Sequence, residues 1–557
     1  MSRTAMVVCP QPEAAESGIE ILKAGGNAID AAIACAMAQT VVDPLMCGIA
    51  GFGSMAVYLP NEGIHEYIDF HAPAPRAAKP DMWAHLIEGE TRDGFGFVLR
   101  GRVNDLGYQS ICVPAALKAF EQVHRERGRL PWAKVLEPAI HWATDGYFVR
   151  PAMYTFFLEG SQMGRAATVE RLAYSPSGRA LYCDPDGSPK RIGAPIRNPD
   201  YAETLRRISA EGADTFYTGE IGACIVADIQ EHGGLLSGED LAHYQPRRVE
   251  PLVGTYRGRR ITTNRPPGGG VMLIEMLNIL EHFDLASLGH NTPEYMRIVS
   301  EAMKRATIDK DAHVGDPAFF DVPLERLTGK DYAAGLAEEI RRGVKAHVPR
   351  LQGADPAPKN TTHISIVDGD GNCVSMTHSL GMPSGVITDG LGFFYNGCMG
   401  VFDPRPGRAG SIAPGKSRFS AMCPTIVFEG DRPSLVPGGA GWNADRHGRA
   451  ADDPERGGFR HDGPAGRSGA AILIDEQRDR CIEPDPAVRH TRARVKGLRD
   501  HPQSVRLHNR LGSHDQSPPR RPRGRRGSRP GRRCLLHKRI ARAARARRNE
   551  SHRCSSC

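Results

Sequence analysis

The segment Asn360-Thr361-Thr362-His363 carries hydroxyl groups that could act as nucleophiles. A threonine hydroxyl is a poor nucleophile at neutral pH unless a base lies beside it. A chain cut just before Thr361 would supply that base as the residue's own α-amine, and the preceding loop, Gly353-Ala-Asp-Pro-Ala-Pro-Lys, suits such a cut. The alternative interpretation is an ordinary strand, because threonine is common in strands. The residues alone do not separate Thr361 from Thr362 as the nucleophile.

Other patterns that could carry chemistry fail on their spacing. The run Asp368-Gly-Asp-Gly-Asn372 begins like a calcium loop, but Cys373 and Ser379 stand where an EF-hand needs Gly and Glu. The glycines of Gly48-Ile-Ala-Gly-Phe-Gly53 lack the spacing of a dinucleotide-binding loop. The chain has no Gly-x-Ser-x-Gly elbow and no His-Glu-x-x-His motif. His363 and His378 flank a hairpin without a third ligand, so we expect no metal and no cofactor.

The hydrophobic pattern predicts the elements that must position these residues. Strands are predicted over residues 361–368, 373–379, 393–395 and 425–428, the first two joined as a hairpin. Helices are predicted over residues 12–24, after a cap at Asn27, and after the proline-glycine run 266–270. On the first strand, Thr362, Ile364 and Ile366 share one face. The pattern is that of an α/β chain.

The net charge of +8 combines two unlike parts. From Asn443 to Cys557 the chain has 29 Arg and Lys against 13 Asp and Glu, a charge of +16, whereas residues 1–442 carry −8. The segment 443–557 holds 27 Arg, 2 Lys and one Phe, with neither Trp nor Tyr, and we expect it to be disordered. It is interpreted as an arginine-rich nucleic-acid arm or as a shifted reading frame on GC-rich DNA. Its shortage of Lys and aromatic residues favours the shift, so nucleic acid is not the expected partner.

Composition excludes some classes of protein. The chain has 557 residues, of which 40% are hydrophobic and 24% charged, and no apolar stretch approaches the length of a membrane-spanning helix. Its thirteen cysteines are dispersed, which fits free thiols better than a disulfide framework. The first residues have too short an apolar run for a signal peptide. We therefore expect a cytoplasmic protein as written, or a periplasmic or secreted one if an N-terminal extension is missing.

In the order of its motifs, the chain resembles the γ-glutamyltranspeptidase family of N-terminal-nucleophile hydrolases, from about residue 5 to about residue 442. The segments that carry the resemblance are Glu20-Ile-Leu-Lys-Ala-Gly-Gly-Asn-Ala-Ile-Asp-Ala-Ala-Ile, Gly48-Ile-Ala-Gly-Phe-Gly, Leu136-Glu-Pro-Ala-Ile with Asp145-Gly146, Gly233-Gly-Leu-Leu-Ser-Gly-Glu-Asp-Leu, Arg265-Pro-Pro-Gly-Gly-Gly, Gly315-Asp-Pro and Thr361-Thr-His-Ile-Ser-Ile-Val-Asp-Gly-Asp-Gly-Asn.

The resemblance implies a four-layer αββα sandwich, made as one precursor that cuts itself between Asn360 and Thr361. Residues 1–360 would form the large subunit, 361–442 would begin the small subunit, and 443–557 would be the tail. Thr361 would be the nucleophile that attacks a γ-glutamyl amide, and water or an amino acid would take the acyl group. The expected partners are a small-molecule substrate and the two chains of the same precursor, with no membrane.

The resemblance also implies roles around Thr361. Ser379 matches a family threonine that supports the nucleophile. The oxyanion of the tetrahedral intermediate needs backbone N–H donors. Gly439 and Gly441, in a predicted glycine turn over 438–441, fall where the family has its oxyanion glycines, although the second of the family's paired glycines aligns best with Trp442.

The predicted substrate-binding residues depart further from the family pattern. His71 stands near the place of a family arginine that holds the glutamyl α-carboxylate, and Arg76 lies five residues beyond it. Ser420 is present from a family pair of serines, but its neighbour is Ala421. The positions that usually hold the α-amine align with Gly381, Cys398 and Val401, which carry no carboxylate, and Asp403, two residues displaced, could substitute.

Three functions follow from these observations. The first is an autoprocessing threonine amidohydrolase and transferase acting on γ-glutamyl amides such as glutathione. Within the same class, an amidase or acylase for another acyl group, or an inactive member, is the alternative, because a charged amino-acid head group without partners is costly to bury. From another class, the basic tail would bind nucleic acid.

Overall fold

The computed structural model describes residues 5–91, 96–161, 164–289, 291–349 and 361–439, together with the backbone of 469–473. These residues belong to one compact unit, Met1–Asp485. Apart from 469–473, the basic segment 443–557 lies outside the described residues, and so do the predictions made for it. No helix among the described residues is long and apolar enough to cross a membrane.

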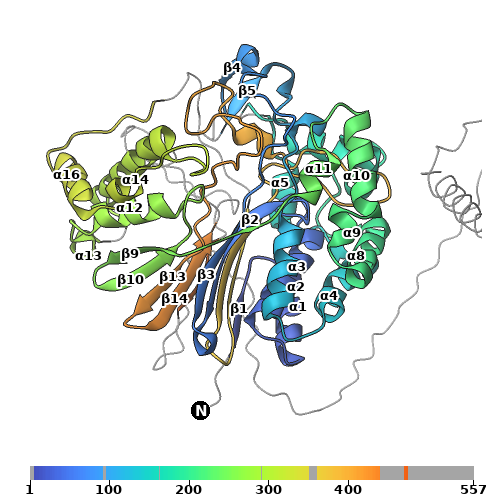
Figure 1. The fold of residues 1–557 in the computed structure, drawn as a ribbon, viewed down its shortest axis with the longest axis horizontal. Helices are drawn as coiled ribbons and strands as arrows, with labels where there is room; N and C mark the ends of the chain where they lie inside the picture. The colour runs from blue at the N-terminus through green and yellow to red at the C-terminus, as the bar shows by residue number, and fades with distance from the viewer. Residues whose placement is uncertain are drawn as a thin grey trace, which may run out of the picture. The chain divides into compact units, whose positions relative to one another are not determined.

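Two antiparallel sheets lie face to face at the centre of this unit (Figure 1). The first sheet has, in spatial order, β1 (Met6–Val8), β11 (Thr362–Val367), β12 (Cys373–Ser379), β2 (Phe52–Leu59), β3 (Ile64–Phe70) and β8 (Arg247–Val249). The second sheet has β15 (Gly469–Leu473), β14 (Arg432–Gly439), β13 (Ile426–Glu429), β10 (Arg259–Thr263) and β9 (Leu252–Tyr256). Two short pairs complete the strands: β4 (Ile87–Glu90) with β5 (Phe97–Leu99), and β6 (Tyr147–Phe148) with β7 (Pro195–Ile196).

Helices cover the outer faces of both sheets (Figure 1). The first helical layer contains α1 (Pro12–Lys23), α2 (Ala28–Val42), α3 (Ala116–Arg127), α4 (Trp132–Asp145), α5 (Pro151–Phe157), α6 (Thr168–Ala173), α7 (Pro176–Tyr182), α8 (Pro199–Glu211), α9 (Asp214–Tyr217), α10 (Glu220–Glu231) and α11 (Gly238–Ala242). The second contains α12 (Gly270–Leu280), α13 (Leu285–Leu288), α14 (Pro293–His313), α15 (Leu324–Leu327) and α16 (Lys330–Arg341). The expected αββα sandwich is confirmed.

Short 3-10 turns lie between these elements. They are η1 (Pro60–Glu62), η2 (Ala84–Leu86), η3 (Arg100–Arg102), η4 (Tyr108–Ser110) and η5 (Cys398–Val401).

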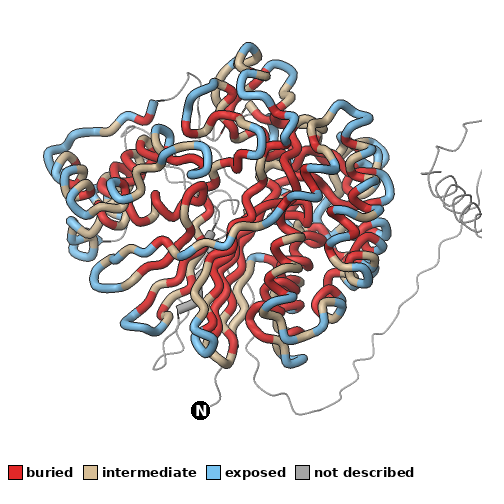
Figure 2. Tube along the Cα trace, in the orientation of Figure 1, coloured by how far each residue is buried: buried red, intermediate tan, exposed pale blue. Residues whose placement is uncertain are grey.

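Helix α2 shows how the local sequence builds the first layer. Asn27 caps it by accepting hydrogen bonds from the N–H groups of Ile29 and Asp30, while the Asp30 carboxylate accepts one from the N–H of Asn27. Every residue of the helix is buried, because its small apolar side chains let it pack between the first sheet and the other helices of its layer (Figure 2). The helices expected over 12–24, after Asn27 and after 266–270 are therefore confirmed.

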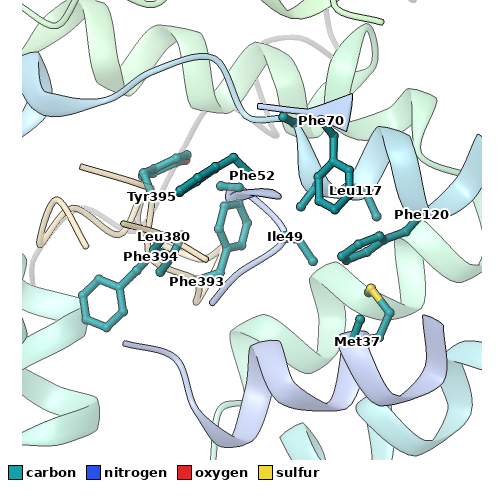
Figure 3. Packing of buried hydrophobic residues seen from close by; sticks show 14 of the residues in the cluster. Met37, Ile49, Phe52, Phe70, Leu117, Phe120, Leu380, Phe393, Phe394 and Tyr395 are labelled. Carbon is teal, nitrogen blue, oxygen red and sulfur yellow. The ribbon is translucent and has the colours of Figure 1, made fainter. Parts of the chain in front are cut away.

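One strand prediction is wrong. Residues 393–395 form no strand, and Tyr395 makes only an isolated bridge to Ala50. All three side chains are instead buried in the core of the first helical layer, where the rings of Phe393 and Tyr395 meet with centroids 5.3 Å apart (Figure 3). A run of consecutive apolar residues fits any buried segment, so only packing could decide its conformation.

Both sheets combine strands from the two sides of the 360–361 bond. In the first sheet, β11 and β12 lie between β1 and β2. In the second, β13 pairs with β10, and Val427 lies opposite Ile261. A small core cluster between the sheets joins Ala56 and Tyr67 of the first sheet to Phe428 of the second. The described residues on the two sides of the 360–361 bond thus share one fold rather than forming separate cores.

Candidate active site

Thr361 lies immediately before β11, at the end of the hairpin that the sequence predicted. Thr362 pairs with His378 across the hairpin, which brings Thr361 next to Ser379. The Thr361 hydroxyl donates to Oγ of Ser379 at 3.4 Å, and the backbone N–H of Gly381 donates to the same oxygen at 2.9 Å. The Ser379 hydroxyl therefore has the position needed to orient that of Thr361.

Thr362 occupies the opposite face of β11, where its hydroxyl is held in a buried network. Its Oγ1 accepts hydrogen bonds from Nε2 of Gln39 at 2.9 Å and from Nε2 of Gln11 at 3.2 Å. Gln11 also donates to Asp43, and Gln39 lies within hydrogen-bond distance of Nε2 of His378. A hydroxyl fixed in this way faces the helices and cannot approach a substrate from the other face. The structure thus separates two threonines that the sequence left equivalent.

His363 lies on the same face of β11 as Thr361, between the two sheets. Its Nδ1 is 2.7 Å from Oγ1 of Thr377 and its Nε2 is 3.0 Å from Oγ of Ser365. Burial lowers the pKa of His363 to about 3, so the ring is neutral near pH 7. Both ring nitrogens are engaged, so His363 anchors the hairpin rather than serving as a base for Thr361.

The predicted oxyanion glycines lie on β14, which packs beside the start of β11. A Cβ atom on Gly438 would lie 1.9 Å from Cε1 of His363, so the His363 ring packs directly against the backbone of Gly438, where only glycine fits. The predicted turn over 438–441 is wrong for its first half, because Gly438 and Gly439 continue the strand and pair with β15. Gly441 lies outside the described residues. The structure therefore brings Gly438–Gly439 to the site and leaves the oxyanion role of Gly439 and Gly441 a prediction.

His71, the first predicted substrate-binding residue, is buried beside Phe52, with ring centroids 6.2 Å apart. Its Nδ1 pairs with Oδ1 of Asp69, whose Oδ2 accepts from Nη2 of Arg247 at 3.0 Å. Burial raises the pKa of Asp69, but His71 and Arg247 outweigh that effect and hold it at about 2. Nε2 of His71 is buried without a hydrogen-bond partner among the described residues. His71 thus presents one unused polar atom close to Phe52.

Arg76 lies apart from this group. Its side chain is 50% exposed, and its guanidinium pairs with Glu239 on α11. Its backbone N–H donates to Oδ1 of Asp240 at 2.9 Å. In this arrangement the Arg76 side chain pairs with α11 at the surface of the molecule and does not contact Thr361 or Ser379.

Asp403 and Ser420 are each held by neighbouring groups. Nε of Arg405 donates to Oδ1 of Asp403 at 2.8 Å and Nη2 to Oδ2 at 2.7 Å, a bidentate pair. Ser420 is buried, and its Oγ accepts from the N–H of Met422 at 3.3 Å. Neither makes a hydrogen bond to Thr361 or Ser379 in the structure. Their substrate-binding roles stay predictions.

Arg418 is the residue that sequence reasoning missed. It lies in the loop before β13, and its guanidinium stacks over the ring of Phe52, 4.4 Å from the centroid. Phe52 is the direct neighbour of Ser379 across β12 and β2. No local pattern marks an isolated arginine in a loop as buried, so only the tertiary contact reveals it.

No group of three His, Cys, Asp or Glu side chains among the described residues is arranged to hold a metal ion. A pocket of about 310 Å³ lies in the second helical layer, where residues such as Phe283, Arg297 and Arg341 line it. None of the candidate site residues lines that pocket. The candidate site is therefore identified by its side chains and their contacts.

Comparison with known proteins decides the family. The family profile described as Gamma-glutamyltranspeptidase matches residues 14–447. The chain belongs to the γ-glutamyltranspeptidase family. Relatives in the family include the "Acylase ACY 1 proenzyme" of Pseudomonas sp. (strain V22), which is 38% identical over 439 residues, covering 78% of this chain and 76% of that protein.

Other members of the γ-glutamyltranspeptidase family carry a different name. The "Glutathione hydrolase proenzyme" of Pseudomonas sp. (strain A14) is 34% identical over 460 residues, covering 78% of this chain and 75% of that protein. The crystal structure of cephalosporin acylase from Bacillus halodurans superposes with a TM-score of 0.66 at 31% identity, covering 78% of this chain and 77% of that one. Both acylases and glutathione hydrolases are thus relatives of this chain, so membership of the family leaves the acyl group open.

Proposed function

We propose that this protein is a proenzyme that cuts itself before Thr361 and then uses Thr361 as an N-terminal nucleophile to cleave amides. The observation that carries the proposal is the placement of the two threonine hydroxyls. Thr361 contacts Ser379 at the start of β11, whereas Thr362 is fixed in the glutamine network on the opposite face. The names of the relatives as proenzymes support the same assignment.

Self-cleavage and turnover would use the same hydroxyl. In the precursor, Oγ1 of Thr361 attacks the carbonyl carbon of residue 360, and the C–N bond breaks to leave an ester and a free α-amine. Water hydrolyses the ester and releases the new carboxyl end. In turnover, the α-amine accepts the hydroxyl proton as Oγ1 attacks the substrate amide, and it returns the proton to the leaving amine. Water or an amino acid then takes the acyl group from the ester.

The acyl group is either γ-glutamyl, as the resemblance implies, or another group, as the acylase relatives suggest. A γ-glutamyl head group needs partners for both a carboxylate and an ammonium. The carboxylate proposed for the ammonium, Asp403, is bound bidentately by Arg405. That pairing favours an amidase or acylase for a different acyl group over a strict γ-glutamyl enzyme.

The proposal predicts two fragments on a denaturing gel of the purified protein, with mass spectrometry placing the new N-terminus at Thr361. Thr361→Ala should give one unsplit band because it lacks the attacking oxygen, and Thr361→Ser should still split. Thr255→Ala, at an exposed threonine on β9, is the matched control and should split like the wild type. A soluble, folded wild-type protein whose 360–361 bond stays whole would overturn the proposal.

A further inference from the structure

Cys9 and Cys35 are neighbouring thiols with unequal exposure. Cys9 directly follows β1 and is half-buried, whereas Cys35 lies inside α2 and is completely buried. Cys9 lies close enough to interact with the Cys35 thiol. Cys112 and Cys398 also interact, but both are completely buried, so a solute has no direct access to either sulfur. The Cys9–Cys35 pair therefore combines a buried thiol with one that solvent can reach.

Packing places the Cys35 sulfur against the side of β1 that leads to Cys9. A Cβ atom on Gly18 of α1 would lie 2.4 Å from Sγ of Cys35 and 3.2 Å from Cγ1 of Val7. Val7 and Cys9 are two residues apart, and alternate side chains of an extended segment point to the same side. Glycine inside a helix is unfavourable compared with alanine. Here it leaves the space in which the Cys35 sulfur reaches Val7 and Cys9.

The unequal exposure fits the two roles of thiol–disulfide exchange. The Cys9 sulfur can displace one half of a small disulfide from solvent, which forms a mixed disulfide and releases one small thiol. Burial, with Cys9 as a lesser cause, raises the pKa of the Cys35 thiol, so Cys35 is not the group that begins the exchange. Cys35 then attacks the Cys9 sulfur, and its proton leaves with the second small thiol. In total the two cysteines lose two electrons and two protons, which the small disulfide takes up.

A bond between Cys9 and Cys35 would join the two segments that hold Thr362. Gln11 follows Cys9 by two residues, and Gln39 follows Cys35 by about one turn of α2. Both glutamines donate to Oγ1 of Thr362. In the first sheet β1 is an edge strand of three residues whose neighbour is β11. A covalent bond would therefore fasten this short edge to α2, and it would also restrict the unfolded chain.

We propose that Cys9 and Cys35 form a disulfide when the folded protein meets a small disulfide oxidant, and that this bond clamps the end of β1 to α2 and stabilises the fold. The pair is a modification site on the helix-covered side of the first sheet, whereas Thr361 and Ser379 meet on the side toward the second sheet. The proposal uses no step of the chemistry proposed for Thr361.

Peptide mapping by mass spectrometry tests the bond in the folded, purified protein. The protein is reduced, freed of reductant, incubated with hydroxyethyl disulfide, unfolded in N-ethylmaleimide and digested. We expect the wild type to give two peptides joined between Cys9 and Cys35, which dithiothreitol separates. Cys35→Ala, in a helix already rich in alanine, should instead keep a mercaptoethanol adduct on Cys9, because the attacking thiol is absent. Cys9→Ser should leave Cys35 unmodified.

Thermal melting curves test the clamp. Oxidation should raise the melting midpoint of the wild type by about 5 °C, and dithiothreitol should reverse the rise. The midpoint of Cys9→Ser should change by less than about 1 °C under the same treatment. The matched control is Cys224→Ser, at a half-buried cysteine of α10, which should form the bond and show the rise like the wild type.

Two results would overturn the proposal. The first is a wild type that keeps the mercaptoethanol adduct on Cys9 or leaves both Cys9 and Cys35 as free thiols. The second is a linked wild type whose melting midpoint does not rise. If a variant fails to fold, the peptide map and the melting curve of the wild type decide. Mass and melting are measured whether or not the 360–361 bond is cut, so failure of this proposal and failure of the proposed function are distinguishable.

Discussion

At the scale of single residues, the face of a strand decides which of two adjacent hydroxyls can react. Successive side chains of β11 point to opposite sides of the first sheet. Thr362 therefore meets Gln11 and Gln39 of the first helical layer, and Thr361 meets Ser379 on the face toward the second sheet. One step along the backbone thus changes a buried structural group into a candidate nucleophile.

Ser379→Ala tests the role of this contact. Removing Oγ deprives the Thr361 hydroxyl and the Gly381 amide of their shared partner. We expect kcat to fall about fivefold with little change in KM, because an orienting hydrogen bond is worth roughly 1 kcal/mol. Ser379→Thr keeps the hydroxyl and should restore most of the rate. Ser177→Ala, at a half-buried serine whose hydroxyl donates to Asp389 rather than contacting Thr361, should leave kcat unchanged. A kcat that is unaffected by Ser379→Ala would remove Ser379 from the site.

At the scale of elements, the contact between β14 and β11 brings the two sheets together beside Thr361. This contact between β14 and β11 depends on Gly438, because a side chain at that position would collide with the ring of His363. His363 cannot move aside easily, since Thr377 and Ser365 hold both of its nitrogens. The site thus rests on a close packing of two elements that are far apart in the sequence.

Gly438→Ala should therefore destabilise the fold by about 3 kcal/mol, at the upper end of the usual cost of overpacking a core. The matched control is Gly335→Ala on α16, where a Cβ meets nothing within 4 Å and φ is not positive. There alanine should stabilise the protein by about 0.5–1 kcal/mol through its helix propensity. Urea denaturation followed by circular dichroism measures the free energy of unfolding of both variants. Equal denaturation midpoints for Gly438→Ala and Gly335→Ala would contradict the packing argument.

At the scale of the whole molecule, both sheets are built from strands on either side of the 360–361 bond. After self-cleavage the two chains would still share their backbone hydrogen bonds and the core between the sheets. We therefore expect the split protein to elute from a native sizing column as one species with the mass of the whole chain. The fragments should separate only in denaturant, and two native peaks would contradict this expectation.

Buried histidines should make the stability of the molecule depend on pH. Burial lowers the pKa of both His363 and His378 to about 3, and His363 adds to the effect on His378. Below an unfolded pKa of about 6.5, the unfolded chain gains protons that the folded chain does not. The stability that the two neutral histidines give the folded protein is therefore fully present above pH 6.5 and is lost as the pH falls toward 3.

At pH 5 the expected loss is about 2 kcal/mol for each of these histidines. Denaturation midpoints measured from pH 7 to pH 5 should fall, and His378→Gln should make the fall shallower. His243→Gln, at an exposed histidine of the first helical layer, should keep the wild-type dependence. A wild-type midpoint that does not change between pH 7 and pH 5 would show that these rings are protonated in the folded protein.

Local sequence signals determined the elements of this protein, because each signal acts within a few residues. Asn27 caps α2 through the next turn of backbone, and the hairpin of β11 and β12 follows from alternation on either side of one turn. The order of motifs also indicated Thr361 as the centre of the candidate site. Only the tertiary structure determined the surroundings of Thr361. It buries Thr362, directs Arg76 to the surface and places Arg418 over the ring of Phe52. These depend on contacts between segments distant in the chain, where burial and pairing of charge, rather than local pattern, set the free energy.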